Sequence, residues 1–317
     1  MKIVVLDGYT LNPGDLSWRA LRAVGDCEVY ERTPVDMVVS RALHADFILL
    51  NKTIIDASTI KALPKLKYIG VLATGYNVVD LDAARARGLA VTNVPEYGTH
   101  SVAQMVFAHI LNYTNHVYQH HVSVTAGQWT EATDFCYWNK PLIELQGCTL
   151  GIIGLGKIGC AVADIALSFG MRVIAHSRSI PDNLATDITV VDQDEVFRQS
   201  DFLTLHCPLT QETDRLVKSQ TLNLMKSSAV LINTSRGQLV DEYSLAAALN
   251  NDSIAHACLD VLAVEPPSSD NVLLHTKHCT ITPHIAWATK AARARLLETA
   301  VNNVRDFIAG RETNRVN

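Results

Sequence analysis

Three residues in the second half of the chain, Arg236, Glu265 and His284, each follow a short apolar run that is typical of a buried strand. The runs that precede them are Val230–Ile232, His256–Leu259 and Thr280–Ile281. Ligand sites in open α/β sheets lie outside the carboxyl ends of the strands. The three side chains are therefore expected to converge on one crevice.

Together these side-chain types suit proton transfer to a carbonyl oxygen next to a bound anion. Histidine is the natural proton donor near neutral pH. A carboxylate beside it would keep the imidazolium protonated and oriented, and an arginine can bind a carboxylate and polarise a carbonyl. Taken singly, each residue has an ordinary alternative: His284 as a structural histidine, Glu265 as a loop charge, and Arg236 as half of a surface ion pair.

Reduction of a carbonyl also needs a hydride donor. The segment G-L-G-K-I-G at 154–159 predicts a binding site for a dinucleotide cofactor that could supply the hydride. It follows the strand candidate 149–153, opens a helix, and is followed at the right distance by a second strand candidate at 172–175. In that setting the pattern is typical of dinucleotide binding. The alternative is a glycine-rich turn needed only for packing.

Each glycine of this segment has a predicted task. Gly154 allows the tight turn, Gly156 lets the backbone approach a pyrophosphate, and Gly159 lets helix and strand pack closely. The N–H groups at the helix start, Lys157 and Ile158, would face the anion.

The next strand ends in His176-Ser177-Arg178, where a site that prefers NAD usually carries Asp or Glu for the adenosine ribose. Ser177 could donate a hydrogen bond to a 2′-phosphate and Arg178 could pair with it. This favours NADPH and leaves NADH open. The alternative for Arg178 is stacking on adenine or exposure to water.

Strand and helix patterns alternate in two blocks, which predicts α/β architecture with parallel sheets. Strand candidates of the first block are Lys2–Leu6, Asp46–Leu50, Tyr68–Leu72 and Ala90–Thr92; those of the second are Thr149–Ile153, Arg172–Ala175, Phe202–Leu205, Val230–Ile232, His256–Leu259 and Thr280–Ile281. Between the blocks, apolar spacing of three and four predicts one long helix from Thr99 to about Val124, which would bridge domains or build a subunit interface. An irregular, aromatic-rich segment follows at 127–146, and a closing helix is predicted at about 289–308.

Bulk properties narrow the class of protein. A length of 317 residues predicts two domains. The net charge of −5 argues against a general nucleic-acid binder. No apolar stretch approaches the roughly 20 residues that span a bilayer, and the first apolar run is too short for a signal peptide. Seven cysteines without a C-x-x-C pair favour a reducing, cytoplasmic compartment.

The segments N-T-S-R-G-Q-L-V-D-E (233–242), L-D-V-L-A-V-E-P (259–266) and T-P-H-I-A-W-A-T (282–289) resemble the signature segments of the D-isomer-specific 2-hydroxyacid dehydrogenase family. The glycine-rich turn and L-H-C-P-L-T-Q-E-T (205–213) match it too, in the family's order and over essentially the whole chain. The resemblance implies NAD(P)H-dependent reduction of a 2-keto acid to a D-2-hydroxy acid, with Arg236 binding substrate, Glu265 supporting the catalytic histidine, and His284 as the acid/base.

The same matching implies further contacts. Ala73, Thr74 and Gly75 resemble the loop whose backbone N–H groups hold the substrate carboxylate. Further cofactor contacts are implied for Thr99, Cys207, Pro208, Thr213, Thr234 and Asp260. Asp260 would face the nicotinamide carboxamide, and its alternative is helix or loop capping.

The family architecture is two Rossmann-like domains, one flavodoxin-like and one dinucleotide-binding, with the cofactor domain inserted into a discontinuous substrate domain. The resemblance therefore implies a substrate domain over 1–98 and 287–317, a cofactor domain over 99–286, and a homodimer.

L-A-T-G-Y-N-V-V-D (72–80), V-P-E-Y-G-T-H-S-V-A-Q-M-V-F (94–107) and P-H-I-A-W-A-T (283–289) look most like the glycerate dehydrogenase, or hydroxypyruvate reductase, branch. Substrates implied are hydroxypyruvate and glyoxylate. A formate or phosphite dehydrogenase is an alternative. A cofactor-sensing transcriptional corepressor is a less expected one, because such proteins usually carry added tails for partner binding, whereas this sequence starts at its first strand candidate and ends soon after its last helix candidate.

No metal site is expected. His116 and His120 share a helix face with His121 alongside, but no carboxylate at a suitable spacing supports them as ligands. Trp138 and Trp287 could wall a substrate pocket, and for Trp138 packing or a dimer contact is an equal alternative.

Overall fold

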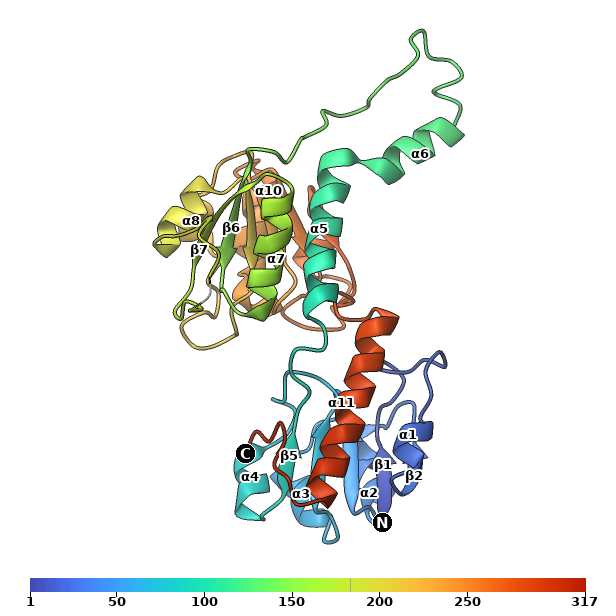
Figure 1. The fold of residues 1–317 in the computed structure, drawn as a ribbon. Coiled ribbons are helices and arrows are strands. Elements are labelled where there is room, and N and C mark those ends of the chain that lie inside the picture. The colour runs from blue at the N-terminus through green and yellow to red at the C-terminus, as the bar shows by residue number, and fades with distance from the viewer. Residues whose placement is uncertain (183) are drawn as a thin grey trace. The chain divides into compact units, whose positions relative to one another are not determined.

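The computed structural model describes residues 1–182 and 184–317 and divides into two compact units. Unit 1 comprises Met1–Gly98 and Trp287–Asn317, and unit 2 comprises Thr99–Ala286. Each unit contains one sheet whose paired strands are all parallel, with helices on both faces (Figure 1). The predicted α/β class is confirmed. Among the described residues, no helix is long and apolar enough to cross a membrane.

The sheet of unit 1 has the strand order β2-β1-β3-β4-β5. Its strands are β1 (Lys2–Val5), β2 (Asp26–Val29), β3 (Phe47–Leu50), β4 (Tyr68–Val71) and β5 (Ala90–Thr92). Its α-helices are α1 (Arg19–Arg22), α2 (Val38–Ala42), α3 (Ala57–Ala62), α4 (Leu81–Ala86) and α11 (Lys290–Ile308). One apolar cluster joins the sheet to α2, α3 and α4, and a second joins its other face to α1 and α11.

Short polar side chains begin several of these helices. Asp56 accepts a hydrogen bond from the Thr59 amide at the start of α3, and Asp80 accepts one from the Ala83 amide at the start of α4. Such caps satisfy amide groups that have no partner inside the helix. They also fix where each helix begins after its strand.

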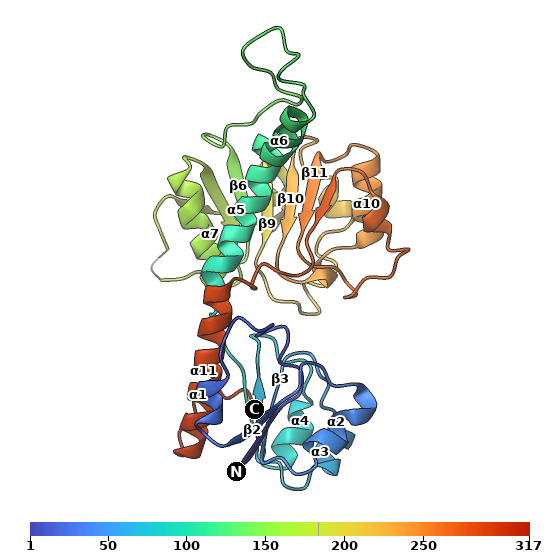
Figure 2. The same ribbon diagram turned by 90° about the vertical axis from the view of Figure 1, so that its right-hand side faces the viewer.

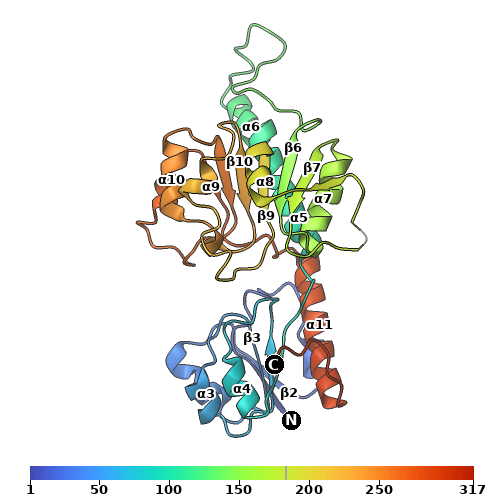
Figure 3. The same cartoon turned by 90° about the vertical axis from the view of Figure 1, so that its left-hand side faces the viewer.

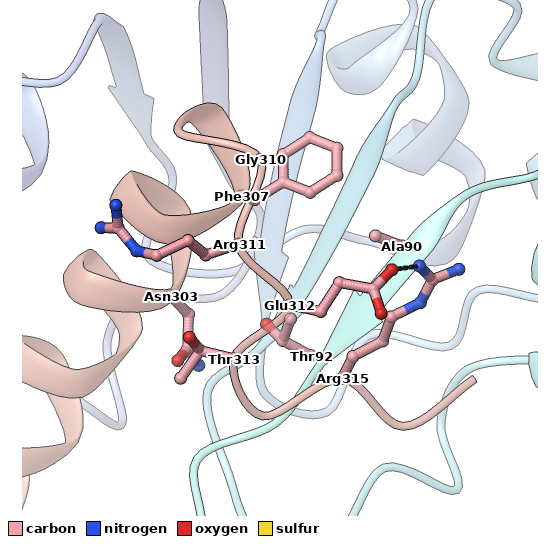
Figure 4. A pocket seen from close by; sticks show the side chains of 9 residues that line it. All are labelled: Ala90, Thr92, Asn303, Phe307, Gly310, Arg311, Glu312, Thr313 and Arg315. Carbon is pink, nitrogen blue, oxygen red and sulfur yellow. Dashed lines mark hydrogen bonds and ion pairs between the residues drawn. The ribbon is translucent and has the colours of Figure 1, made fainter.

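The C-terminal tail covers the outer edge of β5. The Val316 amide donates to the Val91 carbonyl, and the Asn317 side chain accepts from the Val91 amide and donates to the Leu89 carbonyl. A pocket of about 120 Å³ lies between this tail, α11 and β5 (Figure 4). Its two arginines are paired, Arg311 with Asp306 and Arg315 with Glu312.

The sheet of unit 2 has the strand order β12-β11-β10-β9-β6-β7-β8. Its strands are β6 (Thr149–Ile153), β7 (Arg172–His176), β8 (Ile188–Val190), β9 (Phe202–Leu205), β10 (Val230–Asn233), β11 (His256–Leu259) and β12 (Cys279–Ile281). Its α-helices are α5 (Thr99–Asn115), α6 (Val117–Thr125), α7 (Lys157–Ser168), α8 (Gln193–Gln199), α9 (Ser219–Leu222) and α10 (Glu242–Asn250). Helix α5 crosses one face of the sheet (Figure 2), and α8 lies on the other (Figure 3).

The prediction of one continuous helix from Thr99 to about Val124 is wrong. Helix α5 ends at Asn115, and α6 starts at Val117 after a break at His116, whose φ is 49°. A left-handed residue cannot continue an α-helix, and histidine is among the non-glycine residues that adopt this conformation more often than most. Helix α6 therefore leaves the sheet in a new direction (Figure 1).

We call residues 117–144, α6 and the irregular segment after it, the arm. Several of its apolar side chains are exposed, including Tyr118 (72%), Phe135 (88%) and Trp138 (65%). Hydrogen bonds within the arm include Ser123 Oγ with Tyr137 OH at 2.6 Å and Trp129 Nε1 to the Phe135 carbonyl at 3.0 Å. Large exposed aromatic side chains on an extended segment are typical of a surface that meets another protein.

Candidate active site

The strands of unit 2 end level with one another at their carboxyl ends. The register places Ile153 of β6 beside Leu205 of β9, and Leu205 beside Asn233 of β10. Asn233 is in turn beside Leu259 of β11, and Leu259 beside Ile281 of β12. Residues that come after these positions therefore lie along one edge of the sheet, and the predicted site residues of unit 2 other than Thr99 all do so.

The glycine-rich turn begins directly after β6. Gly154 has a φ of 103°, and a Cβ there would lie 2.7 Å from the backbone of His206 and Cys207. A Cβ on Gly159 would lie 2.1 Å from the Gly154 carbonyl oxygen. Only glycine fits at these two positions, because any side chain would overlap main-chain atoms.

Gly156 is different, because a Cβ there would meet no protein atom within 4 Å. The turn thus presents open backbone beside the start of α7, where Lys157 and Ile158 contribute amide groups that have no partner inside the helix. Open backbone next to the positive end of a helix fits the pyrophosphate of a dinucleotide.

At the end of β7, Ser177 and Arg178 already have protein partners. Ser177 Oγ accepts a hydrogen bond from the Leu155 amide (3.2 Å) and donates one to the Ser179 carbonyl (2.8 Å). Arg178 lies 3.8 Å from Glu212, and both side chains are exposed. Glu212, which was not among the predicted site residues, would compete with an anionic ligand for Arg178.

Beyond β9, the candidate cofactor residues hold their own loop together. Thr213 Oγ1 donates to the Pro208 carbonyl (2.6 Å) and accepts from the Thr210 amide (2.8 Å). Cys207 is buried, and burial raises the pKa of its thiol to about 11, so the thiol stays protonated at neutral pH. Its carbonyl accepts a hydrogen bond from Ser235 Oγ (3.1 Å), which ties this loop to the segment after β10.

Thr234 is the residue that directly follows β10. Its hydroxyl oxygen is buried and has no hydrogen-bond partner in the described part of the chain. An unpartnered buried hydroxyl costs about 1–3 kcal/mol, which a polar ligand group at this position would offset. Thr234 therefore fits contact with a cofactor at the same sheet edge as the glycine-rich turn.

Arg236 is exposed two residues further on. Its Nη1 donates to the Ser235 carbonyl (2.7 Å), and it forms no ion pair with an acidic side chain of the described residues. Gly237 packs so closely on the next loop that a Cβ would lie 1.9 Å from the Leu262 carbonyl carbon. That contact joins the segment bearing Arg236 to the segment bearing Glu265.

Glu265 and His284 form a hydrogen-bonded pair. Glu265 Oε2 lies 2.6 Å from His284 Nδ1, and Glu265 Oε1 accepts a hydrogen bond from the Leu262 amide (3.0 Å). Both side chains are about one-third exposed, at 31% and 29%. The carboxylate fixes the ring through Nδ1 and leaves Nε2 as the nitrogen that can exchange a proton with a reacting group.

Asp260, which we expected to face the nicotinamide, is 1% exposed and binds the turn that carries His284. Its carboxylate accepts hydrogen bonds from Thr282 Oγ1 (2.6 Å), the Ile285 amide (2.9 Å) and the Ala286 amide (2.8 Å). These contacts match its alternative role as a loop cap. Its predicted contact with the cofactor stays a prediction.

In unit 1, the loop Ala73–Gly75 follows β4. It is held by hydrogen bonds from Thr74 Oγ1 to the Val94 carbonyl (2.9 Å) and from the Asn93 side chain to the Thr74 carbonyl (2.8 Å). Within the described residues, the backbone N–H groups of Thr74 and Gly75 donate no hydrogen bond to the protein. Unpaired amides in a fixed loop fit an anion such as a carboxylate.

The adjacent strands β1 and β3 of unit 1 are joined at the same edge by Asp7, which the sequence analysis missed. Its carboxylate accepts hydrogen bonds from the amides of Asn51 (2.6 Å), Lys52 (2.6 Å) and Thr53 (2.8 Å). The signal in the sequence was a carboxylate directly after a buried strand.

The model for "D-isomer specific 2-hydroxyacid dehydrogenase, NAD binding domain" matches residues 107–286. The chain is 46% identical to a hydroxypyruvate reductase of Blautia hydrogenotrophica over all of both chains, and 38% identical to a glycerate dehydrogenase of Methylorubrum extorquens over 99% of this chain and 98% of that one. Among solved structures, an acyclic imino acid reductase in complex with NADPH and D-Arg is similar over all of both chains, with a TM-score of 0.87 and 29% identity.

These matches confirm the predicted family and its glycerate dehydrogenase branch. They also agree with the predicted nicotinamide dinucleotide cofactor. The chain therefore belongs to the D-isomer-specific 2-hydroxyacid dehydrogenase family and is a nicotinamide-dependent oxidoreductase that interconverts a 2-keto acid and a D-2-hydroxy acid.

Proposed function

We propose that this enzyme reduces hydroxypyruvate to D-glycerate and also accepts glyoxylate. The observation that carries the proposal is the 2.6 Å pairing of Glu265 with His284, on the same sheet edge as Arg236. The names of the relatives from Blautia and Methylorubrum support the choice of substrate.

In the mechanism that we propose, Arg236 binds the keto acid and polarises its carbonyl oxygen as negative charge develops there. His284 Nε2 gives its proton to that oxygen, while Glu265 holds Nδ1 and stabilises the imidazolium beforehand. When bound, the reduced nicotinamide supplies the hydride to the carbonyl carbon. In the reverse direction His284 accepts the hydroxyl proton.

Other residues have supporting roles in the proposal. Unit 1 is the substrate domain, in which Ala73, Thr74 and Gly75 hold the substrate carboxylate, and unit 2 is the cofactor domain. Cofactor contacts are assigned to Gly154, Gly156, Lys157, Ile158, Gly159, Ser177, Arg178, Cys207, Pro208, Thr213, Thr234, Asp260 and Thr99.

The test is an absorbance assay at about 340 nm with hydroxypyruvate, glyoxylate and pyruvate against NADH and NADPH. We expect hydroxypyruvate to have the highest kcat/KM, and D-glycerate rather than L-glycerate to be oxidised in reverse. Activity on formate or phosphite, with none on the keto acids, would overturn the proposal.

We also propose a preference for NADPH, supported by Ser177 and Arg178 and by the absence of a carboxylate at the end of β7. Arg178→Ala is expected to lower kcat/KM for NADPH about tenfold, a typical effect of losing a hydrogen bond to a charged group, and to change the value for NADH little. Glu212→Gln should instead favour NADPH, because it removes the competing carboxylate.

Arg172→Ala is the matched control, since Arg172 is exposed at the opposite end of the same strand. Equal losses with both coenzymes in Arg178→Ala would contradict the assignment of Arg178 to the 2′-phosphate.

We further propose that the enzyme is a homodimer formed through the arm, whose exposed apolar side chains a second copy would cover. Light scattering is expected to give twice the 34.7 kDa chain mass. Phe135→Asp with Trp138→Asp should shift the mass to that of one chain, because charges would be buried in the interface. The control Tyr243→Asp alters a side chain that is 80% exposed on α10 and should leave the mass unchanged; a monomeric wild type would refute the proposal.

A cytoplasmic location is part of the same proposal. It is supported by the seven cysteines, none of which forms a disulfide in the described residues.

A further inference from the structure

We propose that His109, a buried residue of α5, is a positioning residue for the turn 282–286 that carries His284. It acts through Thr282 and Asp260, and together these three residues fix where His284 stands. The proposal rests on the proposed role of His284 as the acid/base and extends it to a part of α5 beyond Thr99, the residue of this helix that is assigned to the cofactor.

Asp260 is the centre of this arrangement. Its backbone carbonyl accepts a hydrogen bond from the His284 amide (2.8 Å), and its carboxylate accepts from the Ile285 amide (2.9 Å) and the Ala286 amide (2.8 Å). One residue thus holds three successive amides of the turn. Such a hold is needed because His284 has a φ of 53°, a left-handed conformation that non-glycine residues rarely adopt without support.

Thr282 links this centre to α5. Thr282 Oγ1 lies 2.6 Å from Asp260 Oδ1 and 3.3 Å from His109 Nε2. A hydroxyl group has one proton, and the carboxylate of Asp260 can only accept it. The hydroxyl must therefore accept its second hydrogen bond, so His109 is the donor and carries its proton on Nε2.

Burial of His109 and anchoring to β11 keep the hydrogen bonds among His109, Thr282 and Asp260 in this arrangement. His109 is 4% exposed, and burial lowers the pKa of its imidazole although the charge of Asp260 opposes the change. His109 is therefore neutral at pH 7, as the donor role requires. The Asp260 end of these hydrogen bonds is anchored to β11. Asp260 directly follows Leu259, the last residue of that strand, and the Thr282 amide donates to the Leu259 carbonyl (2.9 Å).

A loss of His109 should leave the fold and the cofactor turn in place but loosen the position of the His284 ring. Proton transfer depends steeply on that position. We therefore expect loss of His109 to lower kcat and to leave KM for the keto acid nearly unchanged. A residue that served packing alone would alter the stability of the fold without this selective loss of kcat.

The experiment compares His109→Leu, His109→Gln, Thr282→Val, Thr282→Ser and the double variant His109→Leu/Thr282→Val by steady-state kinetics and thermal unfolding. His109→Leu is expected to lower kcat about fivefold to tenfold with KM changed less than about twofold, since a single neutral hydrogen bond is removed. His109→Gln keeps an N–H donor and should restore most of the rate. Thr282→Val should lower kcat further, and Thr282→Ser should recover it.

The decisive result is the double variant. If His109 acts through the Thr282 hydroxyl, His109→Leu should cost nothing more once that hydroxyl is gone. Thr114→Val, which alters another buried polar residue of α5, is the control and should leave kcat unchanged.

Additive losses in the double variant, an unchanged kcat in His109→Leu, or no recovery in a folded His109→Gln would each overturn the proposal. If His109→Leu does not fold, Thr282→Val against Thr282→Ser, compared in the His109→Gln background, decides the same question. Failure of the wild type to reduce any keto acid would instead count against the proposed function, which keeps the two outcomes distinct.

Discussion

His284→Ala is expected to lower kcat for keto-acid reduction by about 10³-fold, because general acid–base catalysis typically contributes 10²- to 10⁴-fold. The loss should lie in kcat, since the substrate carboxylate is held elsewhere. Binding of NADH or NADPH, followed by fluorescence quenching, should change little. Stopped-flow and steady-state measurements of the variant would separate the chemical step from cofactor binding.

A matched control exists in His278, which is half-exposed and, like His284, has a positive φ, at 57°. His278→Ala subjects the backbone to the same change and should retain full activity. Rapid turnover by His284→Ala would show that another group supplies the proton. Glu265→Gln should give an intermediate loss, because an amide can still orient the ring but cannot stabilise its charge.

Arg236→Ala is expected to lower kcat/KM for hydroxypyruvate by about 10²- to 10³-fold, the scale of a charged donor that stabilises a developing oxyanion. Both KM and kcat should suffer, since the guanidinium would contact the ground state and the transition state. Arg236→Lys should recover only part of the loss, because an ammonium cannot form two parallel hydrogen bonds.

Arg198→Ala on α8, which removes an exposed arginine paired with neighbours on its own helix, is the control for loss of positive charge. An unchanged kcat/KM in Arg236→Ala, with the control also unchanged, would remove Arg236 from the site.

The strands of both sheets could be predicted closely where they are buried on both faces. For β6, β9 and β11 the predicted bounds are the observed ones, because continuous apolar runs mark such strands. The edge strands β2 and β8 were missed. The sequence of β2, Asp26–Val29, alternates exposed and half-buried residues and lacks that signal.

The helix break at His116 could not be predicted, since neither glycine nor proline marks it and the apolar spacing continues past it. The candidate site was easier to predict, because its residues follow strands and parallel pairing places the carboxyl ends of the strands at one edge of the sheet. His109 was missed because its partner Thr282 is 173 residues away. A histidine in an apolar helical run says nothing about which distant hydroxyl it meets.

The carboxyl ends of β9, β10, β11 and β12 lie level with one another, and this limits which mutations the strands can accept. Insertion or deletion of one residue within any of these strands would displace the loop beyond that strand by about 3.3 Å and turn every strand side chain beyond the change to the opposite face. Substitution of one apolar residue for another inside a strand leaves the positions of the strand ends unchanged. We therefore expect the strands of this sheet to keep their lengths while their apolar residues vary, and new substrate preferences to arise in the loops beyond the sheet edge.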